Sequence, residues 1–196
     1  IEGKIRSVAD IGAGVNIFKL DLETVRSRLK MIPMIKEAQV SRSLPATVVI
    51  TIKERVPLGI LPVQGGFIEV DEEGVNLMTA CCSVPGLPVI TGVNVDDVPP
   101  PGQVVQAAGL KDALAVIGGL PGEVVTNLSE VHVDGEDRII LYTIEGIQCK
   151  FGQATEIKEK GVIISQLIQE LRKIGAKVDY IDLSYAGQPV VYYQKQ

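Results

Sequence analysis

The sequence has 196 residues, of which 46% are hydrophobic and 22% are charged, and its net charge is −5 at pH 7. This length and balance indicate a folded chain of one large domain or two small ones. The negative charge argues against nucleic acid as a main partner, because phosphate binding needs a basic surface. No apolar run approaches the roughly 18 residues of a membrane span. The polar opening, IEGKIRSVAD, does not resemble a signal peptide.

Residues 1–57 are predicted to form a compact α/β unit. A short helix is expected over residues 3–10, followed after GAG by a strand-like apolar run, VNIFKL. Asp21 can cap a second helix, and Pro33 ends that helix. The second helix carries one buried stripe at helical spacing, formed by Leu22, Val25, Leu29 and Ile32.

A hairpin with a Leu-Pro turn is predicted over IKEAQVSRSLPATVVITIKERVP, residues 35–57. Side chains alternate across a strand, so one face of this hairpin is apolar and the other is polar. The apolar face consists of Ala38, Val40, Val48, Ile50 and Ile52. A small sheet covered on one face by two helices accounts for this pattern.

Residues 58–196 are predicted to form a larger, mainly antiparallel β unit with two helices. Turns at Gly65-Gly66 and Glu73-Gly74 favour a meander, and the Pro- and Gly-rich residues 79–102 favour an ordered loop. A helix is predicted over QVVQAAGLKDALAVIGGL, followed by strands over EVHVD, RIILYTIEG and IQCKFG. The predicted fold class of the whole chain is therefore α+β.

The longest predicted helix, TEIKEKGVIISQLIQELRKIG, ends at Gly175. Its buried stripe is formed by Ile157, Ile164, Ile168 and Leu171. Two strands, DYIDLSY and PVVYY, close the chain.

Candidate catalytic residues are few. His132 is the only histidine, and it lies in a predicted strand without a recognisable nucleophile elbow around it. The run Asp71-Glu72-Glu73 precedes a glycine and is expected to be a solvated turn. Cys149 is expected to be buried, whereas Cys81 and Cys82 form either an ordinary loop pair or a strained vicinal disulfide. The sequence predicts no enzyme, no metal site and no cofactor.

Four of the five tyrosines, Tyr180, Tyr185, Tyr192 and Tyr193, lie between residue 180 and the end of the chain. Tyrosine is enriched at protein interfaces because its ring buries a large area while its hydroxyl stays in water. A terminal strand is often an edge strand, which can pair with a strand of another chain. Packing between the two strands explains the cluster equally well, so both interpretations stay open.

The stretch GVNIFKLDLETVRSRLKMIPMIKEAQVSRSLPATVVITIKERVP resembles the POTRA domain of the bacterial cell-division family FtsQ, called DivIB in Gram-positive bacteria. The matching positions are Asn16-Ile17-Phe18, Leu29, Pro45, Glu54-Arg55 and Pro57. FIEVDEEGVNL, LPVITG and YIDLSYAGQPVVYY resemble later parts of the same family. IQCKFGQATEIKEKGVIISQLIQEL resembles its strand and helix, with Gly152 and Lys160.

The resemblance implies a POTRA domain over residues 1–57, without its first strand, and a family β domain over residues 58–196. It implies the extracytoplasmic part of a single-pass membrane protein at the division septum, anchored through a segment that is absent here. Such proteins are non-catalytic scaffolds that bind FtsB/DivIC and FtsL and help regulate septal peptidoglycan synthesis. A septal penicillin-binding protein is a further candidate partner.

In this family the last strand and the helix before it form the main partner surface, by strand addition. On this sequence the surface maps to Tyr180, Ser184, Tyr185, Gly187, Val191 and Tyr193. The POTRA hairpin is a second candidate surface, with Arg42, Lys53 and Arg55. Tyr193 stands where Gram-negative members often have tryptophan, which weakens the transfer of partner detail to that position.

Two other functions fit the sequence less well. A POTRA-bearing outer-membrane assembly or transport factor usually brings repeated POTRA units and a barrel. A cell-wall hydrolase needs a convergent nucleophile, acid–base pair or metal site.

Overall fold

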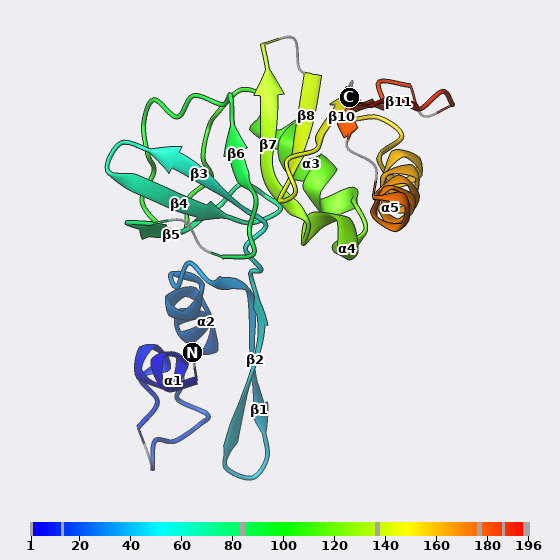
Figure 1. Ribbon diagram of the computed structural model, residues 1–196. Helices are drawn as coiled ribbons and strands as arrows, with labels where there is room; N and C mark the ends of the chain where they lie inside the picture. Colours follow the sequence, from blue (N-terminus) through cyan, green and yellow to red (C-terminus); the bar gives the residue numbers. More distant parts are fainter. Residues whose placement is uncertain are drawn as a thin grey trace.

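The computed structural model describes residues 2–12, 14–82, 85–135, 138–175, 178–185 and 187–193. Within these residues the strands form a two-stranded sheet near the N-terminus and a nine-stranded sheet in the rest of the chain (Figure 1). Each sheet has its own cluster of buried apolar side chains. The predicted α+β fold class is confirmed.

The N-terminal unit consists of two helices and a hairpin. Its elements are α1 (Glu2–Ala9), α2 (Leu22–Lys30), β1 (Ile35–Ser43) and β2 (Thr47–Glu54). The Asp21 carboxylate accepts hydrogen bonds from the backbone N–H groups of Glu23 at 3.0 Å and Thr24 at 3.3 Å. These bonds satisfy donors that the first helical turn leaves without a partner. Both predicted helices and the cap at Asp21 are therefore confirmed.

The predicted hairpin and its apolar face are also confirmed. β1 and β2 pair antiparallel, with Ala38 opposite Ile52 and Val40 opposite Ile50. Ala38 is buried in a core that also contains Leu29 of α2, and the other three side chains of these pairs pack against that core while partly exposed. The hairpin face and the helix stripe thus bury one another.

The strand predicted over residues 15–20 is wrong, because the chain turns there. The backbone N–H of Lys19 donates to the carbonyl of Asn16 at 3.0 Å. The N–H of Phe18 donates to the side-chain oxygen of Asn16 at 2.9 Å. Asparagine side chains that bond the backbone two residues on stabilise turns, and here this local bond prevails over the apolar pattern. The Phe18 ring is left 67% exposed.

The larger unit is a mixed sheet of β3 (Gly59–Val63), β4 (Gly66–Val70), β5 (Asn76–Ala80), β6 (Val89–Thr91), β7 (Leu128–Asp134), β8 (Arg138–Thr143), β9 (Gln148–Gly152), β10 (Val178–Asp182) and β11 (Val190–Tyr193). Its spatial order over the described residues is β11-β10-β9-β8-β7-β6-β3-β4-β5. Five of these pairings are antiparallel, and β3–β6, β6–β7 and β9–β10 are parallel. The prediction of a mainly antiparallel sheet is confirmed.

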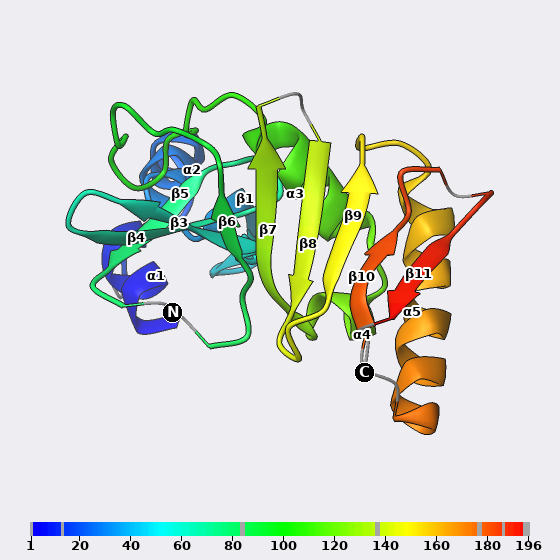
Figure 2. The ribbon, with the colours of Figure 1, turned by 45° about the horizontal axis from the view of Figure 1, so that its top comes forward.

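The helices of the larger unit are α3 (Leu110–Gly119), α4 (Gly122–Val125) and α5 (Ile157–Ile174). They lie along one face of the sheet, where Ile139, Leu141 and Phe151 are fully buried, and Figure 2 shows the opposite face of β7–β10 open. Two helices were predicted, and α4 is additional, since a four-residue turn after Pro121 is too short to show a periodic pattern. No helix in the described ranges has both the length and the hydrophobicity needed to cross a membrane.

Candidate functional site

The last strand, β11, forms one end of the large sheet. It pairs antiparallel with β10, and among the described residues no strand pairs with its other edge (Figure 2). An edge strand presents a row of backbone N–H and C=O groups that another extended chain can bind. Over the described residues, the backbone groups along the outer edge of β11 therefore have no strand partner.

An aromatic pair lies on the open face of this end of the sheet. The rings of Tyr180 on β10 and Tyr192 on β11 are stacked, with centroids 4.2 Å apart and planes inclined by 20°. The Nζ atom of Lys150 on β9 lies 3.8 Å from the centroid of the Tyr180 ring. Loss of hydration raises the pKa of the Tyr180 hydroxyl, and its hydrogen bond with Tyr192 raises it further. Both tyrosines thus take part in packing between the strands.

The other predicted residues of this surface occupy the β10–β11 connection and β11 itself. Tyr185 is 77% exposed and Tyr193 is 56% exposed. The backbone N–H of Ser184 donates to the Asp182 carboxylate at 3.0 Å, which shapes the start of the connection. A side chain added at Gly187 would meet none of the described atoms within 4 Å. The surface is therefore open at this end.

Val191 differs from the exposed residues, because it is half-buried and packs against the large core. Ile181, opposite Val191 on β10, is buried on the same side of the sheet. The structure thus places all six residues predicted for this surface on β10, β11 and the connection between them, although their role in binding stays a prediction. Tyr192 was not among those six, and its place in the tyrosine cluster was the signal that pointed to it.

The strand next to β10 is tied to α5 by a buried lysine. Lys160 is 0% exposed, and its Nζ donates to the carbonyls of Phe151 at 2.9 Å and Gln153 at 3.3 Å. Desolvation lowers the pKa of this ammonium group. Cys149 is also buried, as predicted, and burial raises the pKa of its thiol to about 12. Cys81 and Cys82 are free and exposed, so the predicted loop pair is the arrangement present.

Two hairpin residues predicted as a second surface make contacts within the N-terminal unit. The guanidinium of Arg42 donates to the carbonyls of Ile17 at 2.7 Å and Leu20 at 2.6 Å, so it holds the loop before α2. Lys53 lies 3.4 Å from the Glu37 carboxylate, and both side chains are exposed. An exposed pair of this kind contributes little to stability and leaves the lysine available to a partner.

Arg55, the third hairpin residue, lies at the junction between the two units. Its Nη1 atom is 2.5 Å from the Asp71 carboxylate and 2.6 Å from the Glu73 carboxylate. Lys36 lies 2.6 Å from Glu72 and 3.0 Å from Glu73. We call these five side chains the junction cluster. The predicted turn is present, but its expected solvation is wrong for Asp71, which is 1% exposed because Arg55 and the backbone N–H groups of the turn enclose it.

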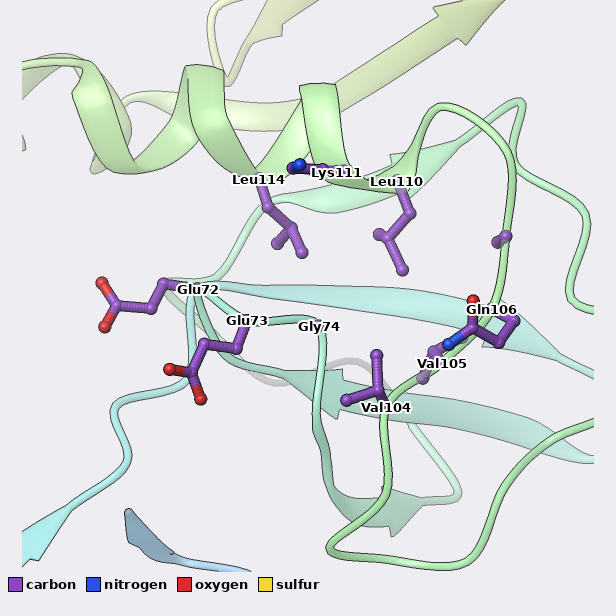
Figure 3. A pocket seen from close by; sticks show the side chains of 10 residues that line it. Glu72, Glu73, Gly74, Val104, Val105, Gln106, Leu110, Lys111 and Leu114 are labelled. Carbon is purple, nitrogen blue, oxygen red and sulfur yellow. The ribbon is translucent and has the colours of Figure 1, made fainter. Parts of the chain in front are cut away.

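A recess of about 470 Å³ opens beside the junction cluster (Figure 3). Leu110 and Leu114 of α3 point into it from one side and Val104 from the other, while the side chain of Glu73 points away. Its inner wall is apolar, and it contains no pairing of a nucleophile with a base.

His132 lies outside this recess. Its Nδ1 is 2.8 Å from the hydroxyl of Thr91, on the neighbouring strand. Within the part of the chain that the structure describes, no three His, Cys, Asp or Glu side chains are grouped so as to hold a metal ion.

The comparisons with known proteins agree with this architecture. A family model described as "POTRA domain, FtsQ-type" matches residues 2–55, and one described as "Cell division protein FtsQ/DivIB, C-terminal" matches residues 59–184. Cell division protein FtsQ of Geobacter sp. (strain M21) is 33% identical over 196 residues, covering 96% of this chain and 69% of that protein. FtsQ of Streptomyces bingchenggensis (strain BCW-1) is 30% identical over 190 residues, covering 96% and 70%.

A solved structure, the major extracytoplasmic domain of the trans isomer of the cell division protein DivIB from Geobacillus stearothermophilus, is also similar. It is 18% identical with a TM-score of 0.43, covering 63% of this chain and 96% of that chain. The sequence matches to the FtsQ proteins cover nearly the whole chain. The resemblance seen in the sequence is thus confirmed, and the chain belongs to the FtsQ/DivIB family of cell division proteins.

Proposed function

We propose that this chain is the extracytoplasmic, non-catalytic part of a single-pass membrane scaffold of the division septum. It binds FtsB/DivIC and FtsL by strand addition to β11 and in this way helps to regulate septal peptidoglycan synthesis. The observation that supports this most is the outer edge of β11, with which no described strand pairs, in a member of a cell-division family. Tyr193 on β11 and Tyr185 in the β10–β11 connection are both exposed.

Strand addition suits this edge for two reasons. Backbone hydrogen bonds to an added strand supply affinity, while the side chains on its two faces supply specificity. The β11 side chains face different surroundings, since Val191 packs on the core side and Tyr192 lies on the open face. A partner strand that alternates between apolar and polar side chains fits both.

The proposal extends to the organisation of the chain and to a second surface. Residues 1–57 act as the POTRA domain and residues 58–196 as the β domain. The exposed Lys53 on the hairpin is available to a further partner, such as a septal penicillin-binding protein, whereas Arg42 and Arg55 have contacts within the chain.

Calorimetric binding of the extracytoplasmic segment of an FtsB/DivIC-type partner tests this proposal. Tyr185→Ala is expected to weaken binding by about 1–3 kcal/mol, as truncation of an interface tyrosine does. The matched control is Phe18→Ala, because Phe18 is also an exposed aromatic residue but lies in the N-terminal unit. Both variants are checked for unchanged thermal unfolding. Equal affinities of a folded Tyr185→Ala variant and the parent protein would move the site away from the end of the sheet.

A deletion from Tyr185 onward separates the two candidate surfaces. Loss of binding in a folded deletion variant supports the site at β11, and retained binding moves it to the POTRA hairpin. Turnover of purified peptidoglycan by the parent chain would instead favour the cell-wall hydrolase and overturn the non-catalytic role.

A further inference from the structure

Three neighbouring strands build a stack of side chains that ends at the free edge. The strands β9, β10 and β11 lie side by side in the sheet (Figure 2). β9 contributes Lys150, β10 contributes Tyr180 and β11 contributes Tyr192. The ammonium group lies 3.8 Å from the first ring centroid, and the two ring centroids are 4.2 Å apart. Each strand therefore adds one layer, at close to the spacing of the strands themselves.

The stack stops at Tyr192 because no described strand follows β11. One face of the Tyr192 ring covers Tyr180, and the residue is 46% exposed. A strand added to β11 would lie about 4.8 Å farther along the sheet. The side chain that it places opposite Tyr192 would lie at stacking distance from the exposed face of that ring.

The surroundings favour a cation as the next layer. The face of a tyrosine ring carries negative charge, so it attracts a cation, as Lys150 already shows at the inner end of the stack. The carboxylates of Asp179 and Asp182 act on Tyr180, the neighbouring ring of the stack, and add negative potential there. Arginine fits best, since its guanidinium is planar, weakly hydrated and stacks on aromatic rings.

We propose that the partner strand places an arginine side chain on the exposed face of Tyr192, where it continues the Lys150–Tyr180–Tyr192 stack. The inference rests on the proposed strand addition at β11 and specifies the chemistry of the partner at that site. It makes Tyr192 a specificity-determining residue and explains why this ring lies at the last position of the stack.

The test is calorimetric titration with a synthetic peptide of the extracytoplasmic segment of an FtsB/DivIC-type partner. Tyr192→Leu, which keeps an apolar side chain but removes the ring, should weaken binding about 3- to 30-fold, the range of a cation–π contact. Tyr192→Phe keeps the ring and should change affinity less than 2-fold, since the cation binds the ring and not the hydroxyl. Phe18→Ala is the matched control, because Phe18 is an exposed aromatic residue that lies outside β11.

The second arm replaces each arginine of the peptide in turn with citrulline, which keeps the shape and removes the charge. One such replacement should weaken peptide binding to the parent protein. The same replacement should not weaken peptide binding to the Tyr192→Leu variant any further, because that variant already lacks the contact. If the parent protein binds no peptide, the proposed strand addition is itself overturned. If it binds but no citrulline replacement couples to Tyr192, or if a partner aromatic residue does so instead, only the arginine contact is wrong.

Discussion

Lys160 lies on the buried side of α5, where a charged group is costly unless it is hydrogen-bonded. The two carbonyls that it reaches belong to the end of β9 and the loop after it, so the ammonium group fixes that loop against the helix. Replacement by methionine keeps the apolar stem but leaves both carbonyls without this donor. We expect Lys160→Met to lower the free energy of unfolding by about 1–3 kcal/mol at pH 7, measured by urea denaturation.

The pH dependence of the stability difference between the parent protein and Lys160→Met tests whether the buried ammonium group of Lys160 causes that difference. Because burial lowers the pKa of Lys160 below its ordinary value of 10.5, the native state loses this proton at a lower pH than the unfolded state does. The parent protein should therefore gain stability relative to Lys160→Met as the pH rises through the interval that ends at 10.5. Lys158→Met is the control, since Lys158 is exposed on the same helix. A stability difference that shrinks with rising pH would contradict this assignment.

Local and distant contacts differ in how far the sequence predicts them. The cap at Asp21 was predictable because its partners lie two and three residues away. The burial of Asp71 was not, because its partner Arg55 lies 16 residues earlier, just after the end of β2. In sequence, carboxylates shortly before a glycine have the pattern of a solvated turn. Only the tertiary fold shows that a cation lies against one of them.

At the scale of elements, the helical spacing of apolar residues predicted the long helix α5 and its buried face. Leu171 is 5% exposed within the large core, as its place on the predicted stripe requires. Leu171→Ala should lower the free energy of unfolding by about 2–5 kcal/mol, because a cavity adds to the lost burial. Val162→Ala on the same helix is the control, since Val162 is 50% exposed and its truncation should cost well under 1 kcal/mol. Similar losses in both variants would mean that the buried face is assigned wrongly.

Elements that depend on neighbours distant in the sequence were harder to predict. The run VNIFKL has a strand composition, yet the side chain of Asn16 turns the chain there. The short strand β6 has three residues and obtains its hydrogen bonds from β3 and β7, which lie far from it in the sequence. No local sequence pattern predicts such a short strand, so the order of the strands in the sheet could not be derived from hydrophobic periodicity.

At the scale of the whole molecule, the candidate site was predictable because it is continuous in sequence. The tyrosine-rich end of the chain forms both β10 and β11, so composition alone pointed to this strand pair. The stack was not predictable, since its Lys150 comes from β9, which precedes α5. The contact between the two units was also unforeseen, because it joins charges of the hairpin to charges of the β4–β5 turn.

The junction cluster predicts that the two units are mechanically coupled. The side chain of Arg55 is 15% exposed and that of Asp71 is 2% exposed, so removing the arginine leaves a buried carboxylate without its cation. Arg55→Met should lower the free energy of unfolding by about 2–5 kcal/mol and should separate the unfolding of the two units in guanidinium titrations. Adding Asp71→Asn, which removes the unpaired charge, should restore part of the loss.

Acid should weaken this coupling in a defined direction. Hydrogen bonds from Arg55 and Lys36 hold the pKa of Glu73 below its ordinary value of 4.5. The stabilisation from this pairing is therefore complete above pH 4.5 and is lost as the pH falls through the lowered native value. Because the Glu73 side chain is 48% exposed, solvent screens the effect, and salt should reduce it further. The stability difference between the parent protein and Arg55→Met should shrink below pH 4.5, and a difference that grows there would show that Glu73 does not contribute to holding the two units together.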